Sequence, residues 1–189
     1  MTISRFAFQK NAAEKALNLS PDKLILNVGC NDDPAHIKGL GDKVVNCDLY
    51  DVDPHLNRQN AADVTFDCVE DVWPFEDNSV SCVILGDIVE HLSYEDRLKA
   101  FKEAYRVSDT LVVTCPNDDR LYDEDGNIPM EPKGLFHIHT VTENDLRDSL
   151  DATGWVVDTW QTVDYDFVPE GYFVVASKNS SQSSDSAAN

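Results

Sequence analysis

The sequence predicts an α/β fold: a doubly wound, mostly parallel sheet of seven strands with helices on both faces. Three observations predict it, namely short apolar runs bounded by turn residues, amphipathic segments between several of them, and two further strand-like runs near the end of the chain. With 189 residues, 42% of them hydrophobic, the chain is long enough for one packed domain. Ligands of such sheets bind beyond the carboxyl ends of the strands, so the loops there hold the candidate site.

Seven apolar runs are expected to be strands. They cover residues 24–28, 43–47, 64–66, 80–85, 111–115, 155–161 and 172–177. Helical periodicity predicts helices over 4–19, 94–107 and 142–153. The last of these begins with a capping-box pattern from Thr142 to Asp145, and Gly154 is expected to end it.

One domain is expected over residues 1–178, with a leading helix and linker over 1–22 and the core over 23–178. Residues 179–189 are almost all Ser, Asp, Ala and Asn, which leave nothing to bury, so a disordered tail is expected there. The start of the chain has no apolar leader, and no apolar run approaches the roughly 18 residues of a membrane span. We therefore expect a cytoplasmic protein that does not enter a membrane.

The composition bears on partners and on the redox state. Acidic residues outnumber basic ones by 35 to 15, a net charge of −20, and the basic residues form no cluster, so nucleic acid is not expected as a partner. The five cysteines include no Cys-x-x-Cys pair, which favours neither a disulfide framework nor a zinc site. Each lies in or just after a predicted strand, as expected of reduced, buried thiols.

A nucleoside-binding pattern surrounds the first two strands. Gly29 directly follows the first strand, and Asp48, nineteen residues later, follows the second, where an acid can accept both hydroxyls of a ribose. A nicotinamide or flavin dinucleotide site would need a G-x-G-x-x-G loop, but Asn31 occupies the second glycine position. Asp32 and Asp33 would also face the diphosphate, which costs electrostatic energy. A phosphate-free sulfonium cofactor meets no such repulsion.

Several motifs in order resemble the small class I S-adenosylmethionine-dependent methyltransferases of the methyltransferase-11 type, which have a Rossmann-like fold. The motifs are LNVGCNDDP at 26–34, VNCDL at 45–49, WPFEDNSV at 73–80, DIVEHL at 87–92, EAYRV at 103–107, TCPN at 114–117 and HIHT at 137–140. The resemblance covers residues 24–177. No single motif is decisive, and the ordered set carries the assignment.

The resemblance implies roles for nine cofactor-binding residues, Gly29, Cys30, Asn31, Asp48, Leu49, Asp67, Cys68, Gly86 and Asp87. Gly29 and Cys30 would line the methionine moiety of S-adenosyl-L-methionine, and Asn31 stands where the family usually has glycine. Asp48 would hold the ribose, and Leu49 would lie against the adenine. Asp67 or Cys68 would contact the adenine amine, whereas Gly86 and Asp87 would lie beside the methyl group.

The candidate catalytic and substrate-binding residues are fewer. His91 and His137 are candidate general bases, although a structural role is the alternative for His91. Tyr122 and His139 are expected on the substrate side, with the long loop over 116–135. No metal site is predicted, because a third ligand to His137 and His139 is not specified.

The function predicted from the sequence is transfer of a methyl group from S-adenosyl-L-methionine to an O or N atom of a small molecule. Two alternatives remain open at this point. One is an NAD(P)-dependent oxidoreductase on a Rossmann-like fold, and the other is a catalytically degenerate methyltransferase fold that acts as a binding module. The oligomeric state and the methyl acceptor are not specified by the sequence.

Overall fold

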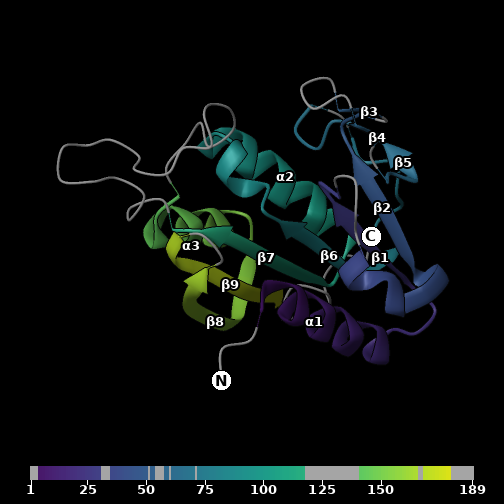
Figure 1. The fold of residues 1–189 in the computed structure, drawn as a ribbon, viewed down its shortest axis with the longest axis horizontal. Coiled ribbons are helices and arrows are strands. Elements are labelled where there is room, and N and C mark those ends of the chain that lie inside the picture. Colours follow the sequence, from purple (N-terminus) through teal and green to yellow (C-terminus); the bar gives the residue numbers. More distant parts are fainter. Residues whose placement is uncertain are drawn as a thin grey trace, which may run out of the picture.

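The computed structural model describes residues 4–30, 35–50, 52–53, 58–59, 61–70, 72–117, 141–165 and 168–179. Its main feature is a seven-stranded sheet with the order β5-β2-β1-β6-β7-β9-β8 (Figure 1). These strands are β1 (Leu24–Val28), β2 (Val44–Asp48), β5 (Val64–Thr65), β6 (Val80–Gly86), β7 (Thr110–Pro116), β8 (Trp155–Tyr165) and β9 (Val168–Lys178).

The sheet is parallel from β5 through β7, and β9 runs antiparallel to both of its neighbours. This confirms the predicted mostly parallel, doubly wound fold. The departures from parallel pairing are the β7–β9 pair and the long β8–β9 hairpin, in which pairing continues to Tyr165 and Val168. Both strands are longer than the apolar runs predicted, because backbone hydrogen bonds extend a hairpin whatever the side chains are.

Three α-helices flank the sheet, and their predicted positions are confirmed to within a residue. They are α1 (Arg5–Leu19), α2 (Tyr94–Val107) and α3 (Glu143–Ala152). The α3 capping box forms as expected: Thr142 Oγ1 accepts from the Asp145 backbone N–H, and the Asp145 carboxylate accepts from the Thr142 N–H, both at 3.1 Å. Gly154, with φ of 87°, follows the end of the helix.

Four short elements were not predicted from the sequence. Two are 3₁₀ segments, Ala35–Lys43 and Val89–His91, and two are the strands β3 (Val52–Asp53) and β4 (Arg58–Gln59), which pair with each other as a separate antiparallel ribbon. The two-residue strands and the three-residue 3₁₀ turn are too short for a hydrophobic period to indicate them, and the nine-residue segment Ala35–Lys43 is interrupted by the non-helical backbone of Gly41.

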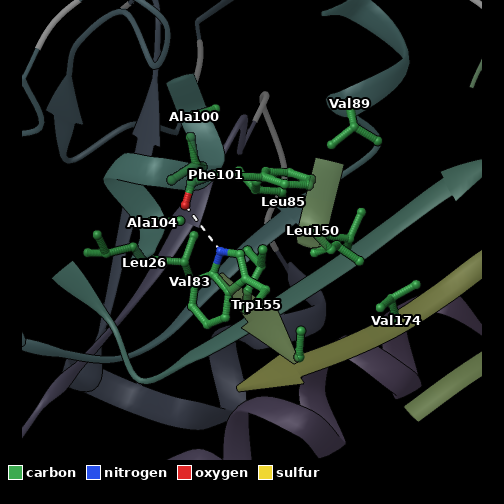
Figure 2. Close-up of a cluster of buried hydrophobic side chains, with 14 of the residues drawn as sticks. Leu26, Val83, Leu85, Val89, Ala100, Phe101, Ala104, Leu150, Trp155 and Val174 are labelled. Carbon is green, nitrogen blue, oxygen red and sulfur yellow. Dashed lines mark hydrogen bonds between the residues drawn. The ribbon is translucent and has the colours of Figure 1, made fainter. Parts of the chain in front are cut away.

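The two faces of the sheet carry different helices. On one face, Phe8, Ala13 and Ala16 of α1 pack against Ile25 of β1 and Ile84 of β6. The other face is covered by α2 and α3, whose buried side chains join alternate residues of the same strands (Figure 2). The Trp155 indole N–H donates to the Phe101 carbonyl oxygen at 3.1 Å in this second cluster. Helices on both faces are therefore confirmed.

The direction of α1 matters for the site. Gln9, in its second turn, lies against Gly86 at the carboxyl end of β6, whereas its last residue, Leu19, is followed by β1 at the opposite edge of the sheet. The first two turns of α1 therefore lie at the edge where the loops after the parallel strands gather. Among the described residues, no helix is both long and apolar enough to cross a membrane.

Two tryptophans and the cysteines differ in burial. Trp155 is a core residue, whereas Trp160 is only half-buried, and the Arg147 guanidinium lies over its ring, with Cζ 3.9 Å from the ring centroid. Four of the five cysteines are buried and Cys68 is half-buried. Of the predicted tail at 179–189, residues 180–189 lie outside the described part of the chain.

Candidate functional site

Two glycines meet at the carboxyl edge of the sheet. Val28 of β1 pairs with Leu85 of β6, so the next residues, Gly29 and Gly86, are neighbours across the two strands. Gly29 has φ of 74°, and a Cβ there would lie 3.0 Å from Ile88 Cδ1. Glycine is the residue that adopts this backbone angle without strain, and here a side chain would also crowd Ile88.

The turn after β1 folds back onto β2. The backbone N–H groups of Gly29 and Cys30 both donate to the Cys47 carbonyl oxygen, at 2.9 and 3.1 Å. This brings Cys30 beside Asp48, the last residue of β2, and the Cys30 thiol and the Asp48 carboxylate share a hydrogen bond. Burial, and then the Asp48 charge, raise the pKa of the Cys30 thiol to about 12, so this thiol is neutral at physiological pH.

Asp48 is a half-buried carboxylate, and its Oδ1 atom accepts the Leu49 backbone N–H at 2.8 Å. Leu49 and Tyr50 follow it with 45% of each residue exposed, so an apolar surface continues directly from the carboxylate. An accessible acid next to an apolar side chain is the combination that a ribose and its base require. The structure thus brings together Gly29, Cys30, Asp48 and Leu49.

Asp67 and Cys68 lie next along this edge. β5 pairs with β2, Asp48 opposite Thr65, and the Phe66 N–H donates to the Asp48 carbonyl oxygen at 3.0 Å. Asp67 Oδ1 accepts the Val69 N–H at 2.9 Å, which forms a short turn just after β5. Burial raises the pKa of the half-buried Cys68 thiol to about 12.

Gly86 and Asp87 connect the edge to α1. Asp87 has φ of 55°, its N–H donates to the Thr114 carbonyl oxygen at 2.8 Å, and its carboxylate is paired with the Arg5 guanidinium. Gln9 Nε2 donates to Thr114 Oγ1 at 2.7 Å. Acidic and polar groups from β6, β7 and α1 therefore meet at the end of β6.

Sequence reasoning missed Arg5 and Gln9. Their signal is weak: Gln9 is a polar residue within the apolar stripe of α1, next to Phe8, and a polar side chain in that position must find a partner in the core. Which partner it finds depends on the packing of α1 against β6 and β7, which no local pattern encodes.

Of the candidate catalytic residues, His91 alone lies in the described part of the chain. It ends the 3₁₀ segment Val89–His91, is half-buried, and donates its backbone N–H to the Ile88 carbonyl oxygen at 3.0 Å. Asn31, Tyr122, His137 and His139 lie outside the described residues. Their predicted roles, and the role of His91 as a base, stay predictions.

A comparison with protein families finds a match to the part of the chain that forms this edge of the sheet. Residues 26–110, which include β1, β2, β5, β6 and α2, match the model of the methyltransferase domain family. This part of the chain is similar to a methyltransferase domain. The match includes every predicted cofactor residue, from Gly29 to Asp87. No curated protein sequence matches the chain.

Solved structures share the fold of this chain. An S-adenosylmethionine-dependent methyltransferase from Methanosarcina mazei aligns with a TM-score of 0.65 and 16% identity, over 94% of this chain and 99% of that one. A second S-adenosylmethionine-dependent methyltransferase, from Archaeoglobus fulgidus, aligns with a TM-score of 0.59 and 17% identity, over 90% of this chain and 94% of that one. Magnesium protoporphyrin IX methyltransferase from Synechocystis, with bound S-adenosylhomocysteine, aligns with a TM-score of 0.63 and 13% identity, over 91% of this chain and 82% of that one. At these identities the likeness shows the fold.

Proposed function

We propose that this protein uses S-adenosyl-L-methionine to methylate an O or N atom of a small molecule. The observation that carries the proposal is the placement of Asp48 at the end of β2, hydrogen-bonded to Cys30 in the turn that Gly29 begins. A nucleoside whose ribose is held by Asp48 would extend from Leu49 toward Gly86. The three solved methyltransferases with the same fold support this use of the edge.

The residues present fit such a cofactor. Asp48 offers a half-buried carboxylate for two ribose hydroxyls, and the exposed side chain of Leu49 offers an apolar surface for adenine. The side-chain oxygen of Gln9 offers a hydrogen-bond acceptor at the methionine end of the cofactor. The acidic character of the chain, −20 overall, also favours a cofactor that carries a sulfonium and an ammonium group over one that carries a diphosphate.

Bound S-adenosyl-L-methionine supplies an electrophilic methyl group, so the task of the chain is to orient the reactants and to exclude water. Gly86 and Asp87 would lie beside the methyl group, at the edge where Arg5 closes onto Asp87. An acceptor that loses a proton needs a base, and His91 and His137 are our candidates, with Tyr122 and His139 on the acceptor side.

Calorimetry with S-adenosylhomocysteine tests the cofactor assignment. The wild-type protein is expected to bind it, and Asp48→Ala is expected to weaken binding about tenfold or more, because charge-assisted hydrogen bonds to the ribose are lost. Asp22→Ala is the matched control, since Asp22 is an exposed acid before β1 at the opposite edge of the sheet. No binding by the wild type, or equal binding by Asp48→Ala, would reject the assignment.

The methyl acceptor is found by a second experiment. Cell extract is incubated with the protein and a cofactor that carries an isotopically labelled methyl group, and labelled products are identified by mass spectrometry. We expect a labelled small molecule with a new O-methyl or N-methyl group. Cofactor binding without any labelled product would instead indicate a binding module on a methyltransferase fold.

A further inference from the structure

We propose that Gln9 of α1 is a cofactor-binding residue. Its side-chain carbonyl oxygen, Oε1, accepts a hydrogen bond from the α-ammonium group of the methionine moiety. This inference rests on the function proposed above, and it goes beyond it by adding a residue from the leading helix, outside the matched methyltransferase domain.

The position of the Gln9 amide is defined by Gly86. A Cβ built on Gly86 would lie 2.4 Å from Gln9 Nε2 and 3.3 Å from Gln9 Cδ, so the amide rests directly on the glycine backbone. Gly86 lies beside Gly29 across β6 and β1. The Gln9 amide therefore lies at the carboxyl end of β6, on the strand next to Gly29, near where the methionine moiety would lie.

The two ends of the Gln9 amide are in different situations. Nε2 donates to Thr114 Oγ1 at 2.7 Å, whereas Oε1 is buried and no atom of the described residues donates to it. Gln9 is only 2% exposed. A buried carbonyl oxygen that lacks a donor costs about 1–3 kcal/mol, and native proteins rarely retain one unless a ligand or an ordered water meets it.

An ammonium group is the donor that fits this oxygen best. Oε1 can only accept, so its partner must carry an N–H or O–H group. The Asp87 carboxylate, which follows Gly86 directly, is paired with the Arg5 guanidinium, and this ion pair holds the first turn of α1 against this edge. A charged N–H donor makes a stronger hydrogen bond to this oxygen than a neutral donor does. The competing occupant is an uncharged donor group of the methyl acceptor.

Two ligands that differ only at the amino-acid end separate these possibilities. S-adenosylhomocysteine contains the ammonium group, whereas 5′-methylthioadenosine keeps the adenosine and the sulfur but lacks the amino-acid end. Calorimetry is expected to show that Gln9→Met weakens binding of S-adenosylhomocysteine about tenfold and leaves binding of 5′-methylthioadenosine unchanged. Gln9→Glu, which keeps an oxygen acceptor, is expected to bind S-adenosylhomocysteine more tightly than Gln9→Met.

Asn11→Met is the matched control, since Asn11 is an exposed amide on the same helix, and both ligands should bind it as they bind the wild type. Wild-type affinity of Gln9→Met for S-adenosylhomocysteine would overturn the inference and assign the oxygen to the acceptor or to water. Equal weakening of both ligands, with a lower melting temperature, would overturn it in favour of a structural role. Failure of the wild type to bind either ligand would overturn the proposed function as well.

Discussion

The Arg5 guanidinium, in the first turn of α1, forms an ion pair with the carboxylate of Asp87, the residue that follows β6. The two residues are 82 positions apart in the sequence. Their side chains are 25% and 29% exposed, so the pair is partly shielded from solvent. It joins the leading helix to the edge of the sheet where the candidate site lies.

The first prediction concerns this pair. Arg5→Gln should speed amide hydrogen exchange in the first two turns of α1, because the helix start is no longer held at β6. The loss in global stability should be about 1 kcal/mol or less, as for other partly exposed pairs. Lys15→Gln removes the same charge from an exposed position of α1 and should leave the exchange unchanged. Similar exchange in both variants would contradict the role given to the pair.

A second prediction separates backbone strain from crowding at Gly29. Gly29 and Gly41 both have positive φ, 74° and 63°, but a Cβ at Gly29 would lie 3.0 Å from Ile88 Cδ1 whereas one at Gly41 would meet nothing within 4 Å. Gly41→Ala should therefore cost roughly 1–3 kcal/mol of unfolding free energy from backbone strain alone, because φ of 63° and ψ of −147° lie in a region essentially restricted to glycine. Gly29→Ala should cost more. Urea denaturation measures both, and equal losses would show that Ile88 yields without cost.

The third prediction concerns the buried thiols. Burial raises the pKa values of Cys30, Cys47, Cys68 and Cys82 from an ordinary 9.0 to about 12. Since the thiolate is the reactive form, iodoacetamide at pH 8 should modify these four in the native protein at least about 100-fold more slowly than in urea. Mass spectrometry of the peptides measures each rate. Rapid native modification of any of the four would show that its thiol is more ionised than burial implies.

The same shifts predict loss of stability in alkali. Between pH 9 and 12 the unfolded chain releases these thiol protons while the folded chain keeps them, so the unfolding free energy falls as pH rises. From pH 9 to pH 10 each such thiol should contribute a fall of about 1 kcal/mol. Cys82→Ala should be less stable at pH 8 but should lose less between pH 8 and 10. An equal loss in both proteins would count against the raised pKa of Cys82.

A prediction for acid pH comes from Glu103 on α2. Its carboxylate accepts from Arg106 Nη2 at 2.7 Å and from the Trp73 backbone N–H at 2.9 Å, and these hydrogen bonds, that of Arg106 first, lower its pKa from an ordinary 4.5. The ionised Glu103 carboxylate therefore stabilises the folded state fully above pH 4.5, and this contribution to the unfolding free energy is lost as pH falls through the lowered pKa. Glu103→Gln should cost about 1–2 kcal/mol at pH 7, and this difference from the wild type should shrink at pH 3.

Glu143→Gln is the matched control for Glu103, because Glu143 pairs with Arg147 at 2.7 Å on the surface and is 47% exposed, against 22% for Glu103. Urea denaturation at both pH values is expected to show a change within about 0.5 kcal/mol for Glu143→Gln. A Glu103→Gln cost that is the same at pH 7 and pH 3 would contradict ionisation as the source of the stabilisation.

The strands and helices were predictable because their signals are local. Every apolar run that was predicted as a strand is one, and α2 has the predicted bounds, Tyr94–Val107. Part of the site was predictable for the same reason: parallel strands end at a common edge, so the spacing of Gly29 and Asp48 predicts that they approach each other. The structure adds the contact itself, through Cys30.

The remaining features depend on contacts between distant segments. The sequence by itself determined the order of strands and helices, the glycine and the acid at the first two strand ends, and a family resemblance now matched over residues 26–110. The tertiary structure alone decided that α1 brings Arg5 to Asp87 and Gln9 to Gly86 and Thr114. The physical reason is that hydrophobic period and motif spacing record local geometry, whereas the partner of a polar side chain on α1 depends on how the whole helix packs across the sheet.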